Sequence, residues 1–278
     1  MRRVVITGVG VLAPNGHGKA AFTAALKEGR SGIRFRPELA SLGFACQVAG
    51  VPENVDGLAQ SYFEPPTLIA MDRCSIIGCI AGLDAWDDAG MPRVQPAVDW
   101  DSAIVFGSGI GAIETIGKTL VPMTDTGRVR RLGSTIPERI MVSAASARLG
   151  GLLGIGGQVS STSSGCSTGA EAIINGYRMI ANGYALRVLA GGCESDSPYV
   201  WAGFDGMRVL TRTCNDTPER ASRPLSATAG GFAPAAGAGA LVLEALARSS
   251  TSNRQVRRGR CTRRRTIHIQ ILWIDSRA

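Results

Sequence analysis

The sequence predicts an α/β domain with a mostly parallel, buried sheet, and three observations support this fold class. Short β-branched runs alternate with longer, Ala-rich runs of helical period through residues 1–248. The chain has 278 residues and is 45% hydrophobic, which is enough for a substantial buried core. Its apolar runs are all shorter than the ~18 residues of a membrane-spanning helix, so we expect neither a signal peptide nor a membrane anchor.

The expected strands and helices alternate along the chain. Each expected strand is a short apolar or β-branched run bounded by Gly, Pro or polar residues, and these runs are 4–7, 103–106, 158–162, 186–190 and 240–244. Each expected helix is a longer run with apolar residues at helical spacing, and these runs are 19–28, 72–89, 138–149 and 167–182.

The helix 167–182 is the best supported of these, because one continuous apolar face runs along it. The residues of that face are Ala170, Ile173, Ile174, Tyr177 and Ala181. Gly183 follows where a left-handed cap would end the helix. The segment therefore runs from strand through a tight turn into a helix, with Cys166 at the turn.

The charge is concentrated at one end of the chain. The net charge is +8, and residues 249–278 carry eight arginines and one acidic residue, or +7, which leaves +1 for residues 1–248. We interpret 1–248 as the folded domain and 249–278 as an Arg-rich tail out of keeping with it, as a shifted reading frame would produce. A basic tail for RNA or an acidic partner is the alternative, but the nearly neutral domain predicts no nucleic-acid binding.

Cysteine and histidine usage narrows the chemistry. The seven cysteines are widely spaced and form no CxxC pair, so we expect no disulfide framework and no zinc site, and a cytoplasmic location. The two histidines are His17 and His268. That scarcity limits every mechanism that needs an imidazole base.

Two glycine patterns, at 7–13 and 107–112, loosely match the dinucleotide-binding motif. Pro14 and Asn15 interrupt the helix that the first pattern would need, and neither pattern is followed by a strand ending in an acidic residue. Close packing of backbone is the simpler interpretation of these glycines.

The turn 165–169 admits two nucleophiles. Ser167 is the centre of a G-x-S-x-G pattern, as in α/β-hydrolases, but that mechanism needs a downstream acid and histidine, and only His268 is available. Cys166 at the first turn of a helix would face the positive end of the helix dipole, which should lower its pKa and help bind an oxyanion. The small residues around it leave room for a bulky thioester.

Seven segments in order resemble the β-ketoacyl-acyl carrier protein synthases of the elongating type, which are thiolase-like condensing enzymes. They are RRVVITGVGVLAPNG near the N-terminus, the helix of 71–91, FGSGIGAIE at 106–114, SSGCSTGAEAI around Cys166, LAGGCES at 189–195, the stretch 203–225 with its Ala-Ser-Arg-Pro end, and GAGALVLE at 237–244.

The resemblance implies the N-terminal half of the duplicated α/β/α/β/α layered thiolase-like fold. It further implies that Cys166 takes an acyl group from acyl carrier protein, for decarboxylative Claisen condensation with malonyl-carrier protein in fatty-acid or polyketide synthesis. Ile110 and Phe204 would border the acyl pocket, and 136–149 would contact the partner of a homodimer. No metal or organic cofactor is implied beyond the phosphopantetheine arm of the carrier protein.

The chain also departs from this family. The two histidines, the lysine and the Gly-Phe-Gly loop of the family's second half match nothing here, and we assign no catalytic role to His17 or His268. Arg73 and Arg208 remain of the basic patch that meets the carrier protein. We therefore expect a fragment that is acylated without completing condensation; the alternatives are a non-catalytic, carrier-binding subunit and a hydrolase that uses Ser167.

Overall fold

The computed structural model describes residues 2–246. The predicted tail 249–278, with His268, lies outside the described residues. Within 2–246, no helix is long and apolar enough to cross a membrane.

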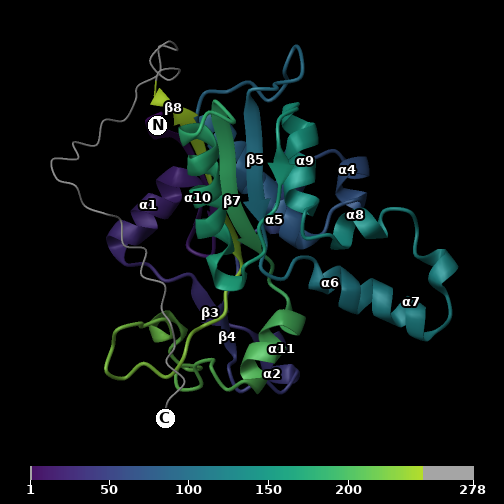
Figure 1. Cartoon of the computed structure of the whole chain (residues 1–278). Coiled ribbons are helices and arrows are strands. Elements are labelled where there is room, and N and C mark those ends of the chain that lie inside the picture. The colour runs from purple at the N-terminus through teal and green to yellow at the C-terminus, as the bar shows by residue number, and fades with distance from the viewer. Residues whose placement is uncertain (1, 247–278) are drawn as a thin grey trace.

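The centre of the molecule is a six-stranded sheet in the order β2-β1-β8-β7-β5-β6 (Figure 1). Its strands are β1 (Val4–Ala13), β2 (Gly16–His17), β5 (Ser102–Gly107), β6 (Val159–Ser160), β7 (Arg187–Glu194) and β8 (Gly237–Ala245). β5 pairs parallel with β6 and β7, whereas β8 lies antiparallel between β1 and β7, and β2 folds back on β1. The prediction of a mostly parallel sheet is therefore wrong. The last strand, β8, inserts between β1 and β7, and both of these strands run in the opposite direction to it.

Four main helices cover the two faces of this sheet: α1 (Gly18–Glu28), α5 (Arg73–Asp88), α9 (Ala144–Leu153) and α10 (Thr168–Ala181). The predicted helix 138–149 is wrong in its continuity, since α8 (Ile136–Ile140) ends at an extended Met141 before α9 begins. The predicted cap of α10 is confirmed: Gly183 has a left-handed φ of 87°.

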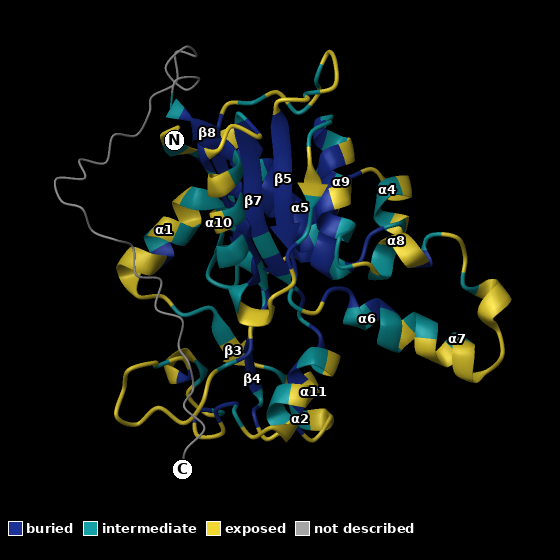
Figure 2. Cartoon of the chain, viewed as in Figure 1, coloured by how far each residue is buried: buried dark blue, intermediate teal, exposed yellow. Residues whose placement is uncertain are grey.

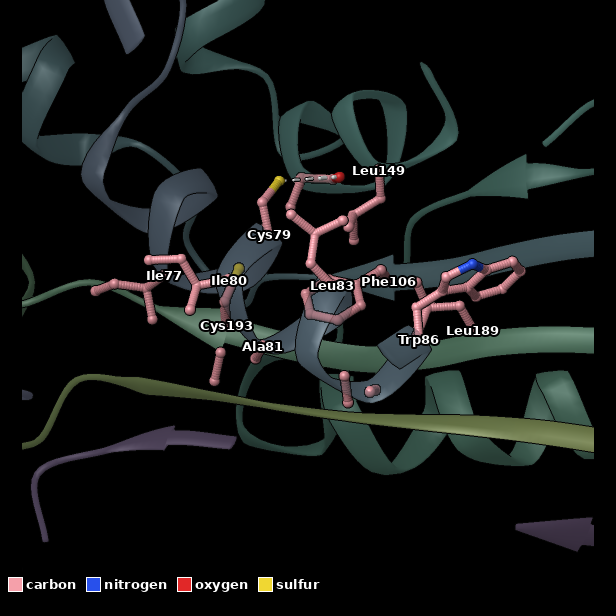
Figure 3. Close-up of a cluster of buried hydrophobic side chains, with 14 of the residues drawn as sticks. Ile77, Cys79, Ile80, Ala81, Leu83, Trp86, Phe106, Leu149, Leu189 and Cys193 are labelled. Carbon is pink, nitrogen blue, oxygen red and sulfur yellow. Dashed lines mark hydrogen bonds between the residues drawn. The ribbon is translucent and has the colours of Figure 1, made fainter. Parts of the chain in front are cut away.

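Successive side chains of each strand point to opposite faces of the sheet, where they enter two separate hydrophobic layers. On β5, Ile104 and Phe106 pack toward α5 and α9, while Ala103 and Val105 pack toward α10. Figure 2 shows the sheet and α5 as the buried interior of the molecule, and Figure 3 shows Trp86 of α5 among the larger side chains of the α5 layer.

The first glycine pattern serves helix packing. A Cβ on Gly8 would lie 2.0 Å from the carbonyl oxygen of Ala85, and one on Gly10 would lie 1.9 Å from that of Ala81. Only glycine allows β1 to approach the backbone of α5 this closely. β1 also continues to Ala13, well beyond the predicted 4–7, because it pairs along β8.

Smaller elements surround this core. They are β3 (Ile33–Phe35), β4 (Val48–Gly50), α2 (Pro37–Ser41), α3 (Val55–Tyr62), α4 (Pro65–Ile69), α11 (Pro198–Gly206) and the 3-10 turns η2 (Val129–Arg131), η3 (Gly165–Ser167) and η4 (Pro218–Arg220). A continuous helical arm of α6 (Ile113–Thr115), the π-helical η1 (Ile116–Leu120) and α7 (Val121–Asp125) projects from the body (Figures 1 and 2).

Candidate active site around Cys166

Cys166 lies on the turn that joins the sheet to α10, as predicted. The turn is η3, and it begins at Gly165, whose φ of 58° is left-handed and favours glycine. Cys166 is exposed, and the next helix starts two residues later. The thiol is therefore presented to solvent at the beginning of a fourteen-residue helix.

Thr168 holds this turn in place. Its buried hydroxyl accepts from the N–H of Ser164 at 2.9 Å and donates to the carbonyl oxygen of Gly165 at 2.7 Å. Thr162 donates to the carbonyl oxygen of Thr168 at 3.1 Å. The residues on both sides of Cys166 are thus tied to the start of α10.

An open cavity of about 590 Å³ lies beside Cys166. Its walls come from β1, β7, β8 and the start of α10, with Phe22 of α1 and Ile173 of α10 as apolar lining. Glycines occupy many wall positions, among them Gly191 and Gly239, so the backbone itself forms much of the surface. Such a cavity has room for an extended apolar chain next to the thiol.

The other described cysteines differ from Cys166 in burial. Cys46, Cys74, Cys79, Cys193 and Cys214 are free thiols and buried. Burial raises the pKa of the Cys79 thiol, and a hydrogen bond with Cys74 together with burial raises the pKa of Cys193. Because the thiolate is the nucleophilic form, these buried thiols are poor nucleophiles.

A loop from the end of β5 packs against the Cys166 turn, and Glu194 at the end of β7 binds that loop. The Glu194 carboxylate accepts from the N–H of Gly109 and, at 3.2 Å, from the hydroxyl of Ser108. Burial raises the pKa of the Glu194 carboxyl, and its hydrogen bonds to Gly109, Ser108 and Ile110 oppose that rise.

Sequence analysis did not single out Glu194, although a signal was present. β5 and β7 are parallel, and Gly107 pairs with Gly192 at their carboxyl ends. Residues that follow two neighbouring parallel strands meet at one edge of the sheet. An acidic residue just after the Gly-Gly of 191–192 could thus have been placed beside the loop 107–111.

Neither of the two residues predicted to border the acyl pocket lines the cavity beside Cys166. Ile110 is 41% exposed at the tip of the loop beside the Cys166 turn. Phe204 is on α11, where its ring packs edge-on against Phe232 with centroids 5.4 Å apart, and it does not line the cavity beside Cys166. The role of Ile110 and Phe204 in an acyl pocket stays a prediction.

Ser167 lacks the partner that a serine hydrolase needs. His17 is the single histidine of residues 2–246. Its ring hydrogen bonds with Asp84 at 2.9 Å, and it lines a different cavity from that of Cys166. The described part of the chain therefore offers no imidazole base to Ser167.

Three comparisons with known proteins identify the family of this chain. Residues 1–249 match the family model described as "Beta-ketoacyl synthase, N-terminal domain". The chain is 33% identical over 99% of its length to the actinorhodin polyketide putative beta-ketoacyl synthase 1 of Streptomyces coelicolor, and 33% identical over 87% to 3-oxoacyl-[acyl-carrier-protein] synthase 2 of Vibrio harveyi. A beta-ketoacyl synthase structure from Burkholderia phymatum superposes over 92% of the chain with a TM-score of 0.84 and 28% identity.

The match covers only part of each relative. The chain spans 60% of the length of the Streptomyces protein and 58% of the Vibrio protein. It covers 62% of the Burkholderia structure. These matches confirm the expected N-terminal half of the thiolase-like fold.

Proposed function

This chain belongs to the β-ketoacyl synthase family, and from that premise we propose that Cys166 accepts an acyl group from the thioester of an acyl carrier protein. The observation that carries the proposal is the position of Cys166: it is exposed at the start of α10, beside an open cavity, while the other cysteines of 2–246 are buried. We infer that the acyl donor is an acyl carrier protein from the name of the Vibrio relative.

The proposed step is a thioester exchange. The Cys166 sulfur attacks the thioester carbonyl, the new carbon–sulfur bond forms, and the carrier thiol leaves with the proton that Cys166 gives up. The N-terminus of α10, which begins two residues after Cys166, supplies its positive dipole to the oxygen that becomes negative. This exchange needs no metal or organic cofactor besides the pantetheine arm of the donor.

Selective alkylation tests the nucleophile. Iodoacetamide should modify Cys166 at least about tenfold faster than Cys79 or Cys193, since burial keeps those thiols protonated and out of reach. Peptide mapping by mass spectrometry measures each site. Equal rates at Cys166 and Cys79 would reject Cys166 as the nucleophile.

An exposed basic turn is the best candidate for carrier-protein docking. Arg128, Arg130 and Arg131 are exposed on the loop after α7, as Figure 2 shows for that projecting segment. Arg73, which sequence analysis retained for this role, instead pairs with Asp56 and Asp196. The free arginine cluster thus suits an acidic carrier better than Arg73 does.

Charge reversal at Arg130 and Arg131 tests this docking site. The double variant R130E/R131E should raise the KM for acyl-carrier protein by roughly tenfold, because it removes electrostatic attraction at the rim of the contact. The KM for a small acyl thioester without carrier protein should not change. Arg30→Glu, an exposed charge reversal outside the arm, is the matched control.

A second function, acyl transfer without condensation, is favoured by the position of His17. Its ring is held by Asp84, away from the Cys166 cavity, so we assign no described residue to malonyl decarboxylation. The purified chain should then become acylated but release no carbon dioxide from malonyl-carrier protein. Robust release of carbon dioxide would favour the full synthase activity instead.

We further propose a cytoplasmic homodimer that uses residues 136–149. Met141 of this segment is 55% exposed, and Val159 on the nearby edge strand β6 is 38% exposed. A segment with an exposed apolar side chain next to a sheet edge is suited to association with a second copy. Light scattering of the wild type and Met141→Lys would test it: the variant should shift toward monomer.

A further inference from the structure

Resting on the proposed acylation of Cys166, we propose that Glu194 is a positioning residue for acyl-chain selection. Its carboxylate fixes the loop 107–111 against the Cys166 turn. The loop in turn carries Ile110, the residue that the family resemblance predicts to border the acyl chain.

Glu194 binds the loop at several points. One carboxylate oxygen accepts from the N–H of Gly109, and the other accepts from the hydroxyl of Ser108. The N–H of Ile110 also stabilises the charged carboxylate. The carboxylate therefore sits against the first half of the loop as a shared acceptor.

The hydrogen bonds reach both sides of Ile110. On one side, Gly109 is bound to Glu194 directly. On the other side, the N–H of Gly111 donates to the hydroxyl of Ser108 at 2.8 Å, and this hydroxyl donates to Glu194. Ser108 is 2% exposed, so this connection is shielded from water. The backbone on both sides of Ile110 thus depends on one carboxylate.

The loop also touches the nucleophile turn. A Cβ on Gly109 would lie 3.0 Å from a Glu194 carboxylate oxygen and 3.1 Å from the carbonyl oxygen of Gly165. Ser163, three residues before Cys166, donates to the carbonyl oxygen of Gly109 at 3.4 Å. Glu194 and Gly165, the residue before Cys166, therefore both lie next to Gly109, and a shift of Gly109 would change the packing of the Cys166 turn.

A neutral amide cannot replace this carboxylate fully. In Glu194→Gln one of the two acceptor oxygens becomes an NH₂ group, so either Gly109 or Ser108 faces a donor and loses its acceptor. The loop should then sample other positions, and Ile110 should no longer limit the length of acyl chain that reaches Cys166.

The test measures acylation of Cys166 in the full chain by butanoyl and decanoyl N-acetylcysteamine thioesters, with mass spectrometry as readout. E194Q should change the ratio of the two rates by about fivefold, the effect of losing about one net hydrogen bond. Alkylation by iodoacetamide, which needs no acyl pocket, should change less than about twofold. Glu171→Gln, which removes a neighbouring charge on α10, should leave the ratio as in the wild type.

A double-variant cycle separates positioning from general loosening. Ile110→Ala should shift the ratio by itself, and adding E194Q to it should cause no further shift, because Glu194 acts through Ile110. Ser108→Ala, which removes the hydroxyl connecting Glu194 to Gly111, should shift the ratio in the same direction and serves if E194Q does not fold.

Three results would count against the proposal in different ways. An unchanged ratio in E194Q and S108A would reject the role of Glu194, and equal effects of E194Q with and without Ile110 would reject its action through that side chain. Absence of any acylation of Cys166 in the wild type would instead reject the proposed function itself.

Discussion

The hydroxyl of Thr168 should stabilise both the fold and the presentation of Cys166. Thr168→Val keeps the branched shape of a side chain that is 3% exposed, but removes its bonds of 2.9 Å to Ser164 and 2.7 Å to Gly165. Ser164 and Gly165 are themselves exposed, so their freed groups can bind water. We therefore take about 1 kcal/mol for each bond and expect a loss of about 2 kcal/mol in the free energy of unfolding.

Urea unfolding followed by circular dichroism measures this loss, and iodoacetamide alkylation measures the reactivity of Cys166. Since T168V frees the turn from the start of α10, alkylation should slow by roughly two- to fivefold, the range of a helix-dipole contribution. Thr168→Ser keeps the hydroxyl and removes one methyl group, so it should lose about 1 kcal/mol with unchanged alkylation. If T168V alkylates at the wild-type rate, as T168S is expected to do, Thr168 does not hold the nucleophile turn.

Three further predictions concern Gly10, Glu194 and His17. Gly10→Ala should lower the free energy of unfolding by about 1–3 kcal/mol through its clash with the α5 backbone, whereas Gly151→Ala, which has open space around it, should be neutral or stabilising in urea unfolding. Because the folded state raises the pKa of Glu194 above its ordinary value of 4.5, the wild type should gain stability relative to E194Q as the pH falls from neutral toward that ordinary value; a relative loss in urea unfolding over this range would contradict that shift. His17→Gln should lose no more than about 1 kcal/mol with its partly exposed bond to Asp84, and its rate of Cys166 acylation should equal that of the wild type.

Local patterns predicted the turn at Cys166 well. The apolar face of α10 and the glycine after it are features of the nearest residues, so they could be read without knowing the rest of the fold. The structure confirms both Gly183 as the cap and the start of α10 just after Cys166.

Features that depend on distant residues were harder to predict. The length of β1 comes from its pairing with β8, more than two hundred residues later, and the position of β8 makes the sheet mixed. The break between α8 and α9 at Met141 contains no Gly or Pro from which it could have been predicted. Likewise, the link from Glu194 to Gly109 joins residues 85 positions apart, which only the parallel pairing of β5 and β7 brings together.

Acylation of the full chain by an acyl-carrier protein tests whether Cys166 is the acyl acceptor. Peptide mapping after the reaction should find the acyl group on Cys166, and Cys166→Ser should carry no acyl thioester while keeping the wild-type circular dichroism spectrum. An acyl group found instead on Cys79, Cys193 or another cysteine, or retained as a thioester in the Cys166→Ser variant, would contradict the claim.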